Sequence, residues 1–184
     1  NAECLTVLAR AGYDVYRDVL NTPAFLTFLP SIVGLNGLDI GCGEAGNTRV
    51  LAGKGAKMFD IDFAPTFIRH AREAEQHTPL DIEFHLADCK ELPFAQASFD
   101  FAVAFMSLMD VDDLDRALDE AYRLFKPGGF CNFRFCTPVL SPLAARKYVM
   151  RTAIRSVAHR ENISHLVLEK SNPRRSAPLR MISR

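Results

Sequence analysis

The sequence predicts an α/β fold in which a mainly parallel sheet lies between two layers of helices, as a three-layer sandwich. Short apolar stretches alternate with segments of helical spacing along most of the chain, as in strand-helix-strand units. One of these stretches, Gly37–Ile40, runs directly into a glycine loop and then into a helix start. The 184 residues, 48% of them hydrophobic, are enough for one continuous core.

Periodicity and turn residues place the elements in order. Residues 3–20 carry apolar side chains at helical spacing and predict one or two leading helices. Thr22 and Pro23 begin a short helix that Pro30 stops. Strands are predicted near residues 37–40, 57–61, 82–86, 101–106 and 130–135, and helices near 48–53, 65–74 and 112–126.

Two of the predicted strands differ in their apolar pattern. Residues 82–86 alternate apolar and polar side chains, which is typical of an edge strand, whereas residues 101–106 are continuously apolar, which is typical of a central strand. Ligands of such sheets bind beyond the carboxyl ends of the strands. We therefore expect the loops that follow Ile40, Ile61, Ala87 and Phe105 to meet.

Composition argues against several kinds of partner and site. The formal net charge of zero gives no whole-chain attraction to nucleic acid or to an acidic membrane surface, and the longest apolar segment is too short to span a bilayer. Five cysteines without a C-x-x-C pair argue against a disulfide framework and a structural zinc site, and favour a reducing cytoplasm. The five histidines have no ligand spacing, so no metal site is expected.

The loop that follows the first strand is suited to a small organic cofactor. Gly41 and Gly43 remove the Cβ atoms that would block a ligand and permit a tight turn. Asp62 lies 19 residues after Gly43, at the tip of the second strand, where a carboxylate can accept hydrogen bonds from both hydroxyls of an adenosine ribose. The alternative role of Asp62 is a helix N-cap, and Asp60 is the alternative ribose ligand.

Two further acids follow strands of the predicted sheet. Asp88 closes the third strand, where it can accept a hydrogen bond from the exocyclic amine of adenine, or it is a turn aspartate. Asp39 can orient the glycine loop or bind an amino group, directly or through water. Many buried aspartates at strand ends instead accept backbone N–H bonds.

With these residues the chain resembles the class I S-adenosylmethionine-dependent methyltransferases, and among them the small-molecule enzymes of the ubiquinone and menaquinone biosynthesis type. Five motifs carry the resemblance in order over about residues 13–137: Leu38-Asp39-Ile40-Gly41-Cys42-Gly43, Asp62 with Ala64-Pro65, Ala87-Asp88 with Leu92-Pro93-Phe94, Ser98-Phe99-Asp100, and Leu124-Phe125-Lys126-Pro127-Gly128-Gly129. One departure lies in the loop. Ala45 stands where the family usually has its third glycine, and Gly46 comes one residue late. Alanine is small enough for the pocket to survive.

The resemblance implies a Rossmann-like fold that binds S-adenosyl-L-methionine as its cofactor. The methionine end would lie over the glycine loop, the ribose against Asp62, and the adenine on Phe63 with Asp88 and Cys89 at its edge. Phe63 could equally be a core residue. The backbone near Phe105 would close the other side. The full set of implied cofactor residues is Asp39, Gly41, Cys42, Gly43, Asp62, Phe63, Asp88, Cys89 and Phe105.

The sequence assigns no catalytic residue. A sulfonium is already an activated methyl donor, so the protein has chiefly to align the acceptor and exclude water, and a general base is optional. Acceptor contacts are expected from Tyr13, Tyr16 and Arg17 and from residues 107–110. Helix packing for the tyrosines and a surface ion pair for Arg17 are the alternatives.

The resemblance fades beyond Cys136, so residues 1–136 are expected to form a methyltransferase core with leading helices, and residues 137–184 an atypical basic segment, partly disordered. Residues 141–184 carry ten basic and two acidic side chains, which either remain solvated or bind an anionic partner. The family sheet ends in a further helix and an antiparallel strand pair. Here the sequence predicts only a helix near 143–158, one strand near 163–168 and an unstructured end from 171, so the C-terminal strand hairpin is expected to be incomplete.

The function predicted from these features is S-adenosylmethionine-dependent methyl transfer to a small-molecule acceptor. An inactive cofactor-binding or scaffold protein is the first alternative, because of the atypical C-terminal segment. A nicotinamide-dependent oxidoreductase is the second, because glycines 41, 43 and 46 match G-x-G-x-x-G. Asp88 and the Lys126-Pro127-Gly128-Gly129 turn argue against the oxidoreductase, which requires neither.

Overall fold

The computed structural model describes residues 2–134 and 165–169. The elements follow one another in this order: α1 (Ala2–Arg10), the π-helix η1 (Tyr16–Asn21), α2 (Thr22–Thr27), β1 (Asn36–Ile40), α3 (Gly46–Gly53), β2 (Lys57–Asp62), α4 (Pro65–His77), β3 (Glu83–Leu86), β4 (Phe99–Phe105), the 3-10 helix η2 (Leu108–Asp110), α5 (Leu114–Leu124), β5 (Phe125–Arg134) and β6 (His165–Glu169). The strand and helix alternation predicted from the sequence is confirmed.

One sheet organises the described residues, with the strand order β3-β2-β1-β4-β5-β6. The first five strands of this order are parallel, and β6 pairs antiparallel with β5. The strand predicted at the edge, β3, is at the edge, and the continuously apolar β4 lies between β1 and β5. Parallel pairing brings the carboxyl ends of β1, β2, β3 and β4 to the same side of the sheet.

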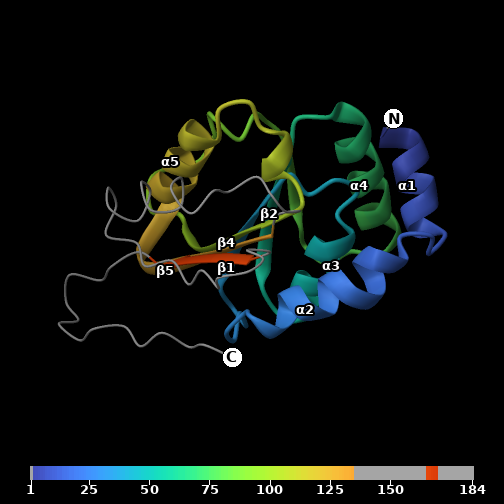
Figure 1. The fold of residues 1–184 in the computed structure, drawn as a ribbon, viewed down its shortest axis with the longest axis horizontal. Helices are drawn as coiled ribbons and strands as arrows, with labels where there is room; N and C mark the ends of the chain where they lie inside the picture. Colours follow the sequence, from blue (N-terminus) through green and yellow to red (C-terminus); the bar gives the residue numbers. More distant parts are fainter. Residues whose placement is uncertain (1, 135–164, 170–184) are drawn as a thin grey trace.

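Helices cover both faces of the sheet, as the three-layer prediction requires (Figure 1). On one face, alternate residues of β1 and β4 such as Leu38 and Ala102 pack with buried residues of α5. On the other face, Phe101 and Val103 of β4 pack with buried residues of α2, α3 and α4. The two apolar layers arise because successive side chains of a strand point to opposite faces.

The leading segment, residues 2–27, lies against the helical layer that contains α4. Gly12 has a left-handed backbone (φ 75°) just after α1, so α1 and η1 are two elements rather than one. The side chain of Arg10 donates to the carbonyl oxygen of His70 over 2.9 Å, and Arg69 pairs with Glu3 at 2.7 Å. These contacts fix α1 beside α4, where Figure 1 shows the two helices adjacent.

The boundaries of two predicted elements differ from the structure. The helix expected over 112–126 is α5, which begins after Asp113, whose side chain accepts the backbone N–H of Arg116 over 3.1 Å. The strand expected at 130–135 is β5, which already begins at Phe125, because Phe125 pairs with Phe99 of β4. The strand expected near 163–168 is β6. The helix expected near 143–158 and the unstructured end from 171 lie outside the described residues.

Gly37 of β1 is required by close packing across the sheet. A Cβ atom at this position would overlap the ring of Phe101, which is fully buried and stacked on Phe130 with ring centroids 5.5 Å apart. We expect Gly37→Ala to lower the free energy of unfolding by about 3 kcal/mol, because the core has no space for the methyl group. Urea unfolding followed by circular dichroism measures this change.

Gly53→Ala is the matched control, since nothing lies within 4 Å of a Cβ atom at Gly53. This variant should be neutral or more stable by up to about 1 kcal/mol, because alanine has the higher helix propensity. Equal stabilities of the two variants would contradict the packing argument.

Candidate functional site

A cavity of about 960 Å³ opens at the carboxyl ends of β1, β2, β3 and β4. Its floor is the glycine loop over residues 40–44, and its walls come from the leading segment, the end of β2, residues 87–90 and residues 105–112. The predicted meeting of the loops after Ile40, Ile61, Ala87 and Phe105 is therefore confirmed. A volume of this size suits a ligand of cofactor dimensions with room to spare.

Eight of the nine predicted cofactor residues line this cavity: Gly41, Cys42, Gly43, Asp62, Phe63, Asp88, Cys89 and Phe105. The ninth, Asp39, does not contribute to the lining. Its side chain is 1% exposed and accepts a hydrogen bond of 2.6 Å from the hydroxyl of Thr48 in the first turns of α3. The structure thus places Asp39 beneath the loop, where it orients the start of α3.

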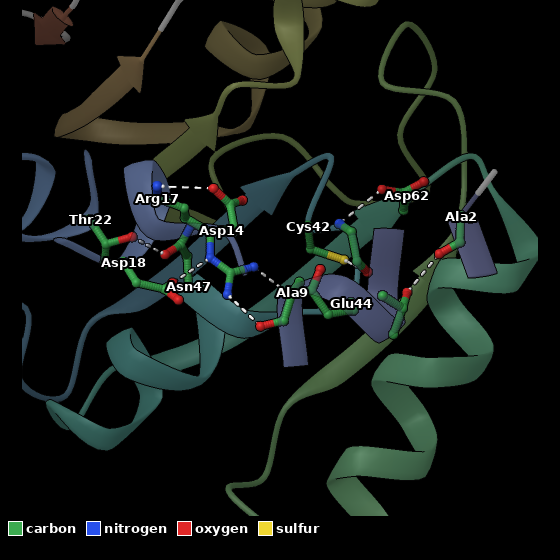
Figure 2. Close-up of polar contacts among 12 residues, drawn as sticks. Ala2, Ala9, Asp14, Arg17, Asp18, Thr22, Cys42, Glu44, Asn47 and Asp62 are labelled. Carbon is green, nitrogen blue, oxygen red and sulfur yellow. Dashed lines mark hydrogen bonds and ion pairs between the residues drawn. The ribbon is translucent and has the colours of Figure 1, made fainter. Parts of the chain in front are cut away.

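Asp62 connects the two loops that follow β1 and β2. Its Oδ2 accepts the backbone N–H of Gly43 over 3.0 Å (Figure 2). Its Oδ1 accepts the backbone N–H of Ala64 over 2.8 Å. Burial raises the pKa of Asp62, and the backbone donors of Ala64, Gly43 and Phe63 oppose that rise. The bond to Ala64 fits the helix-capping alternative, since α4 begins directly afterwards at Pro65.

The residues expected around an adenine ring, Phe63, Asp88 and Cys89, lie on an exposed part of the cavity wall. Phe63 is 80% exposed, so the alternative of a core residue is wrong. Asp88 is exposed, and its Oδ1 accepts the backbone N–H of Lys90 over 2.9 Å, as in the turn alternative. Burial and the charge of Asp88 raise the pKa of the Cys89 thiol to about 11, so Cys89 is neutral at pH 7.

The glycine loop packs tightly against the loop that follows β4. Gly41 has a positive φ of 78°, and a Cβ atom there would overlap the side chain of Ser107. Ser107 donates its hydroxyl to the carbonyl oxygen of Ile40 over 2.5 Å. Met106 has a positive φ of 60°, which is a strained backbone for a non-glycine residue at the cavity wall. Glycine at position 41 is thus needed for both conformation and space.

Two buried aspartates lie side by side under the loop. Asp39 and Asp60 are directly paired in the register of β1 and β2, and both are at most 1% exposed. Within the described part of the chain, Asp39 Oδ1 and both oxygens of Asp60 have no hydrogen-bond partner. The alternative of Asp60 as a ribose ligand is not supported, because Asp60 is absent from the described cavity lining.

Burial and neighbouring acids raise the pKa values of Asp39 and Asp60. Burial raises the pKa of Asp39 to about 7, and the charges of Asp62 and Glu44 add to the effect while the Thr48 hydrogen bond opposes it. Burial and then the charge of Asp39 raise the pKa of Asp60 well above its ordinary value. Two buried carboxyl groups on paired positions of neighbouring strands cannot both ionise cheaply, so together they hold at least one proton near pH 7.

The cavity offers no activated nucleophile among the described residues. Burial, followed by the charge of Asp60, raises the pKa of the Cys42 thiol well above its ordinary value, so it is neutral at pH 7. Lys90 is bonded to Asp112 at 2.7 Å, and this contact raises the pKa of the ammonium. The arrangement is therefore suited to binding and aligning ligands rather than to covalent catalysis.

The acceptor contacts expected from the sequence are largely brought to the cavity. Tyr13 and Arg17 line it, as do Ser107, Leu108 and Asp110. The side chain of Tyr16 lies outside what the structure describes.

Further lining residues had no signal in the linear pattern. Leu5 and Leu8 belong to the predicted leading helices and Glu44 follows Gly43 in the glycine loop, and no site role was predicted for these three residues.

The cavity lining is strongly acidic. Its described residues include the bases Arg17 and Lys90 and six acids, which are Asp14, Glu44, Asp62, Asp88, Asp110 and Asp112. A hollow of this sign with low-dielectric walls favours cationic ligands over anionic ones.

Two further features are absent from the described residues. They contain no group of three or more His, Cys, Asp or Glu side chains arranged to hold a metal ion. None of the helices in residues 2–134 has the length and apolar content needed to cross a bilayer.

Fold and site together define a Rossmann-like α/β domain with a cavity at the carboxyl edge of its sheet. The chain belongs to the methyltransferase domain family, whose model matches residues 38–133, about half of the chain. The matched region runs from β1 into β5 and so contains the glycine loop, Asp62 and Asp88. The family predicted from the five sequence motifs is confirmed.

Individual relatives agree with this family. A sterol 4-C-methyltransferase from Caenorhabditis elegans is 35% identical over 94 residues, which are 50% of this chain and 28% of the relative. A demethylmenaquinone methyltransferase from Renibacterium salmoninarum is 28% identical over 160 residues, 82% of this chain and 65% of the relative. The chain therefore spans less than two thirds of the length of either enzyme.

A solved structure extends the comparison to the fold. An S-adenosylmethionine-dependent methyltransferase from Mesorhizobium loti superposes with a TM-score of 0.69, covering 80% of this chain and 96% of that one. Its sequence identity is 18%, so this likeness concerns the fold alone. The mainly parallel, Rossmann-like sheet is confirmed by it.

The buried pair makes stability depend on pH. A carboxyl group whose pKa is raised on folding stabilises the fold fully below its unfolded pKa, near 3.8 for Asp39, and that stability is lost as the pH rises through about 7. Asp60→Asn removes the neighbouring charge. We expect the free energy of unfolding of this variant to exceed that of wild type by about 1–3 kcal/mol at pH 8. At pH 4 the difference between the two proteins should be much smaller.

Urea unfolding at the two pH values measures the effect. Asp81→Asn is the control, because Asp81 is exposed and has a positive φ of 58° that asparagine also tolerates. A higher free energy of unfolding for wild type than for Asp60→Asn at pH 8 would contradict the view that ionisation of the buried pair is unfavourable.

Proposed function

We propose that this domain binds S-adenosyl-L-methionine and transfers its methyl group to a small-molecule acceptor. The observation that carries the proposal is the single cavity in which the glycine loop, Asp62 and Asp88 meet at the ends of three neighbouring strands. Membership of the methyltransferase domain family supports the same assignment. In it, Asp62 binds the ribose hydroxyls, Phe63 contacts the adenine face, and Asp88 and Cys89 lie at the adenine edge.

Charge supports a sulfonium cofactor over a dinucleotide. S-adenosyl-L-methionine carries a positive sulfur, whereas a nicotinamide dinucleotide carries an anionic pyrophosphate. The pyrophosphate would lie against the glycine loop, in a cavity whose described lining has six acidic and two basic side chains. The alternative of a nicotinamide-dependent oxidoreductase is thereby disfavoured.

We further propose an apolar acceptor. Leu5, Leu8 and Tyr13 of the leading segment line the cavity mouth and remain between 44% and 74% exposed. An apolar ring system would cover them. The sterol and demethylmenaquinone named for two relatives are ring systems of this kind.

The proposed reaction relies on placement. The cofactor supplies a methyl group already activated on its sulfonium, and the chain holds the acceptor in line with the S–CH₃ bond and keeps water out. The thiols of Cys42 and Cys89 are neutral at pH 7, because the pKa of each is raised. They are therefore weak nucleophiles that do not compete with the acceptor for the methyl group. Free cysteines at 4, 42, 89 and 131 favour the reducing cytoplasm as its compartment.

Titration calorimetry with S-adenosyl-L-methionine, followed by transfer of a radiolabelled methyl group to quinols and sterols, tests the proposal. Saturable binding and labelled product with at least one ring acceptor are expected. Absence of binding at millimolar cofactor would refute the function. Binding without transfer to any acceptor would instead favour the cofactor-binding alternative.

Asp62→Asn tests the ribose contact. We expect a loss of cofactor affinity of about ten-fold to a hundred-fold, equivalent to about 1–3 kcal/mol, because the amide cannot accept hydrogen bonds with both terminal atoms. Calorimetric titration of variant and wild type measures it. Asp100→Asn is the control, since Asp100 also accepts a backbone N–H, from Asn36 over 2.9 Å, but does not line the cavity. Equal losses in both variants would argue against the assignment.

A further inference from the structure

Asp39 and Asp60 lie on the same face of the sheet, beneath the glycine loop. They are register partners on β1 and β2, and neighbouring strands of a sheet are about 4.8 Å apart. The hydroxyl of Thr48 in α3 donates to Asp39 over 2.6 Å, which identifies this face as the one covered by α3. Met58, two positions before Asp60, packs in the apolar layer of the same face. The two carboxyl groups are therefore neighbours, at 1% and 0% exposure.

Little in the described structure stabilises a negative charge on this pair. Thr48 donates to one oxygen of Asp39, whereas the other oxygen of Asp39 and both oxygens of Asp60 have no hydrogen-bond partner within the described residues. The register partners on the outer sides are Val103 of β4 and Phe84 of β3, which carry no charge. A buried carboxylate without donors is costly, so its ionisation depends strongly on any charge placed nearby.

Titratable groups act on the pair from the glycine loop, the end of β2 and α4. They are the Cys42 thiol, Glu44, Asp62 and Glu75. Glu44 is bonded to Arg17 of η1 over 2.7 Å. Glu75 is bonded to Arg49 of α3 over 2.7 Å. The nearby arginines are thus engaged with other acids, and the surroundings of the pair are acidic.

The glycine loop separates the pair from the cavity. Gly41, Cys42 and Gly43 line the cavity and follow directly after β1, which carries Asp39. The proposed function places the methionine end of the cofactor, with its positively charged sulfonium, over this loop. A positive charge at that place favours the ionised form of carboxyl groups beneath it, since a low-dielectric interior screens the interaction weakly.

We propose that the Asp39–Asp60 pair releases a proton to solvent when the sulfonium form of the cofactor binds, and takes one up again when the positive charge has left. This inference rests on the proposed function. Methyl transfer removes the charge, because the electron pair of the broken S–CH₃ bond stays on sulfur. The pair does not line the cavity, so it acts on the affinity for the charged cofactor and not on the reacting atoms.

The direction of the pH dependence follows from this coupling. The free pair holds at least one proton near pH 7, because burial raises the pKa of both groups. A bound cation lowers the pKa again, so binding releases a proton and the affinity for the cation rises with pH. The neutral thioether product exerts no such effect. The pair therefore makes discrimination between cofactor and product depend on pH.

Calorimetry on the wild-type protein with S-adenosyl-L-methionine and S-adenosylhomocysteine tests the inference, because the two compounds differ by one methyl group and one positive charge. Titrations at pH 7 in phosphate, PIPES and imidazole buffers, whose ionisation enthalpies differ, give the number of protons released. We expect about 0.3–0.5 proton for S-adenosyl-L-methionine and less than about 0.1 for S-adenosylhomocysteine. Affinity for the first compound should also rise about four-fold from pH 5.5 to pH 7, and for the second by less than about two-fold.

The outcomes separate the inference from the proposed function. Equal proton release with both compounds would overturn the inference and leave the proposed function standing. Failure of both compounds to bind would overturn the two together.

Two substitutions with opposite expected effects assign the proton to the pair. Asp60→Asn removes one acid, so Asp39 ionises at lower pH and proton release at pH 7 should fall to less than about 0.1. Thr48→Val removes the hydrogen bond that favours ionised Asp39 and raises the pKa of that carboxyl group further. Wild type should release more protons at pH 6 than at pH 8, whereas Thr48→Val should show the reverse order. Wild-type behaviour of both variants would overturn the assignment to the pair.

Asp100→Asn is the matched control. Asp100 accepts the backbone N–H of Asn36 over 2.9 Å, pairs with Lys126 and lies outside the described cavity lining. Its proton release should equal that of wild type, and a loss as large as that of Asp60→Asn would overturn the assignment. Should either variant of the pair fail to fold, the comparison of the two compounds on wild type still decides the inference, because it needs no substitution.

Discussion

The site depends on the carboxylate of Asp62, which joins the two loops that follow β1 and β2. In-register parallel pairing brings Ile40 opposite Ile61, so both strands end at the same level. Asp62 then accepts one backbone N–H from Gly43 and one from Ala64. Since these donors belong to the cavity floor and to the residue before α4, one charged group fixes both. The loop conformation and the helix direction cannot change independently.

The sequence was informative wherever a physical requirement had a local pattern. The apolar run of β4, the alternation of β3 and the amphipathic spacing of α5 each reflect the burial of one element, so their positions in the sheet could be predicted. The carboxyl-edge cavity followed from parallel topology. The Arg17–Glu44 pair could not be predicted, because it joins residues 27 positions apart through the path of the leading segment. The π-helical turn of η1 likewise has no spacing that distinguishes it.

The interpretation of Asp39 shows a similar limit. Its place at the end of a strand, beside a glycine loop, suggested contact with a ligand amino group. Asp60 of β2 pairs with Asp39 in the register of the two strands and is buried beside it. The hydroxyl of Thr48 in α3 donates to the Asp39 carboxylate. Desolvation therefore favours the protonated form of these two acids, which lie beneath the loop rather than in the cavity lining. The register of β1 on β2, which decides this, is a property of the folded sheet.

In the glycine loop, alanine stands at position 45, where the family usually has its third glycine, and glycine follows at position 46. Ala45 adopts φ 68°, a left-handed conformation that costs alanine about 1 kcal/mol or more relative to glycine. Its methyl group is fully buried in the core layer of α3 and α4, which returns roughly 0.8 kcal/mol. The loop thus tolerates alanine at 45 at small net cost. At position 46 a Cβ atom would come within 2.9 Å of Glu44 Oε1, so a side chain there would shift the Glu44 carboxylate and with it the contact to Arg17. The glycine at 46 thus leaves room for a charged pair at the cavity wall.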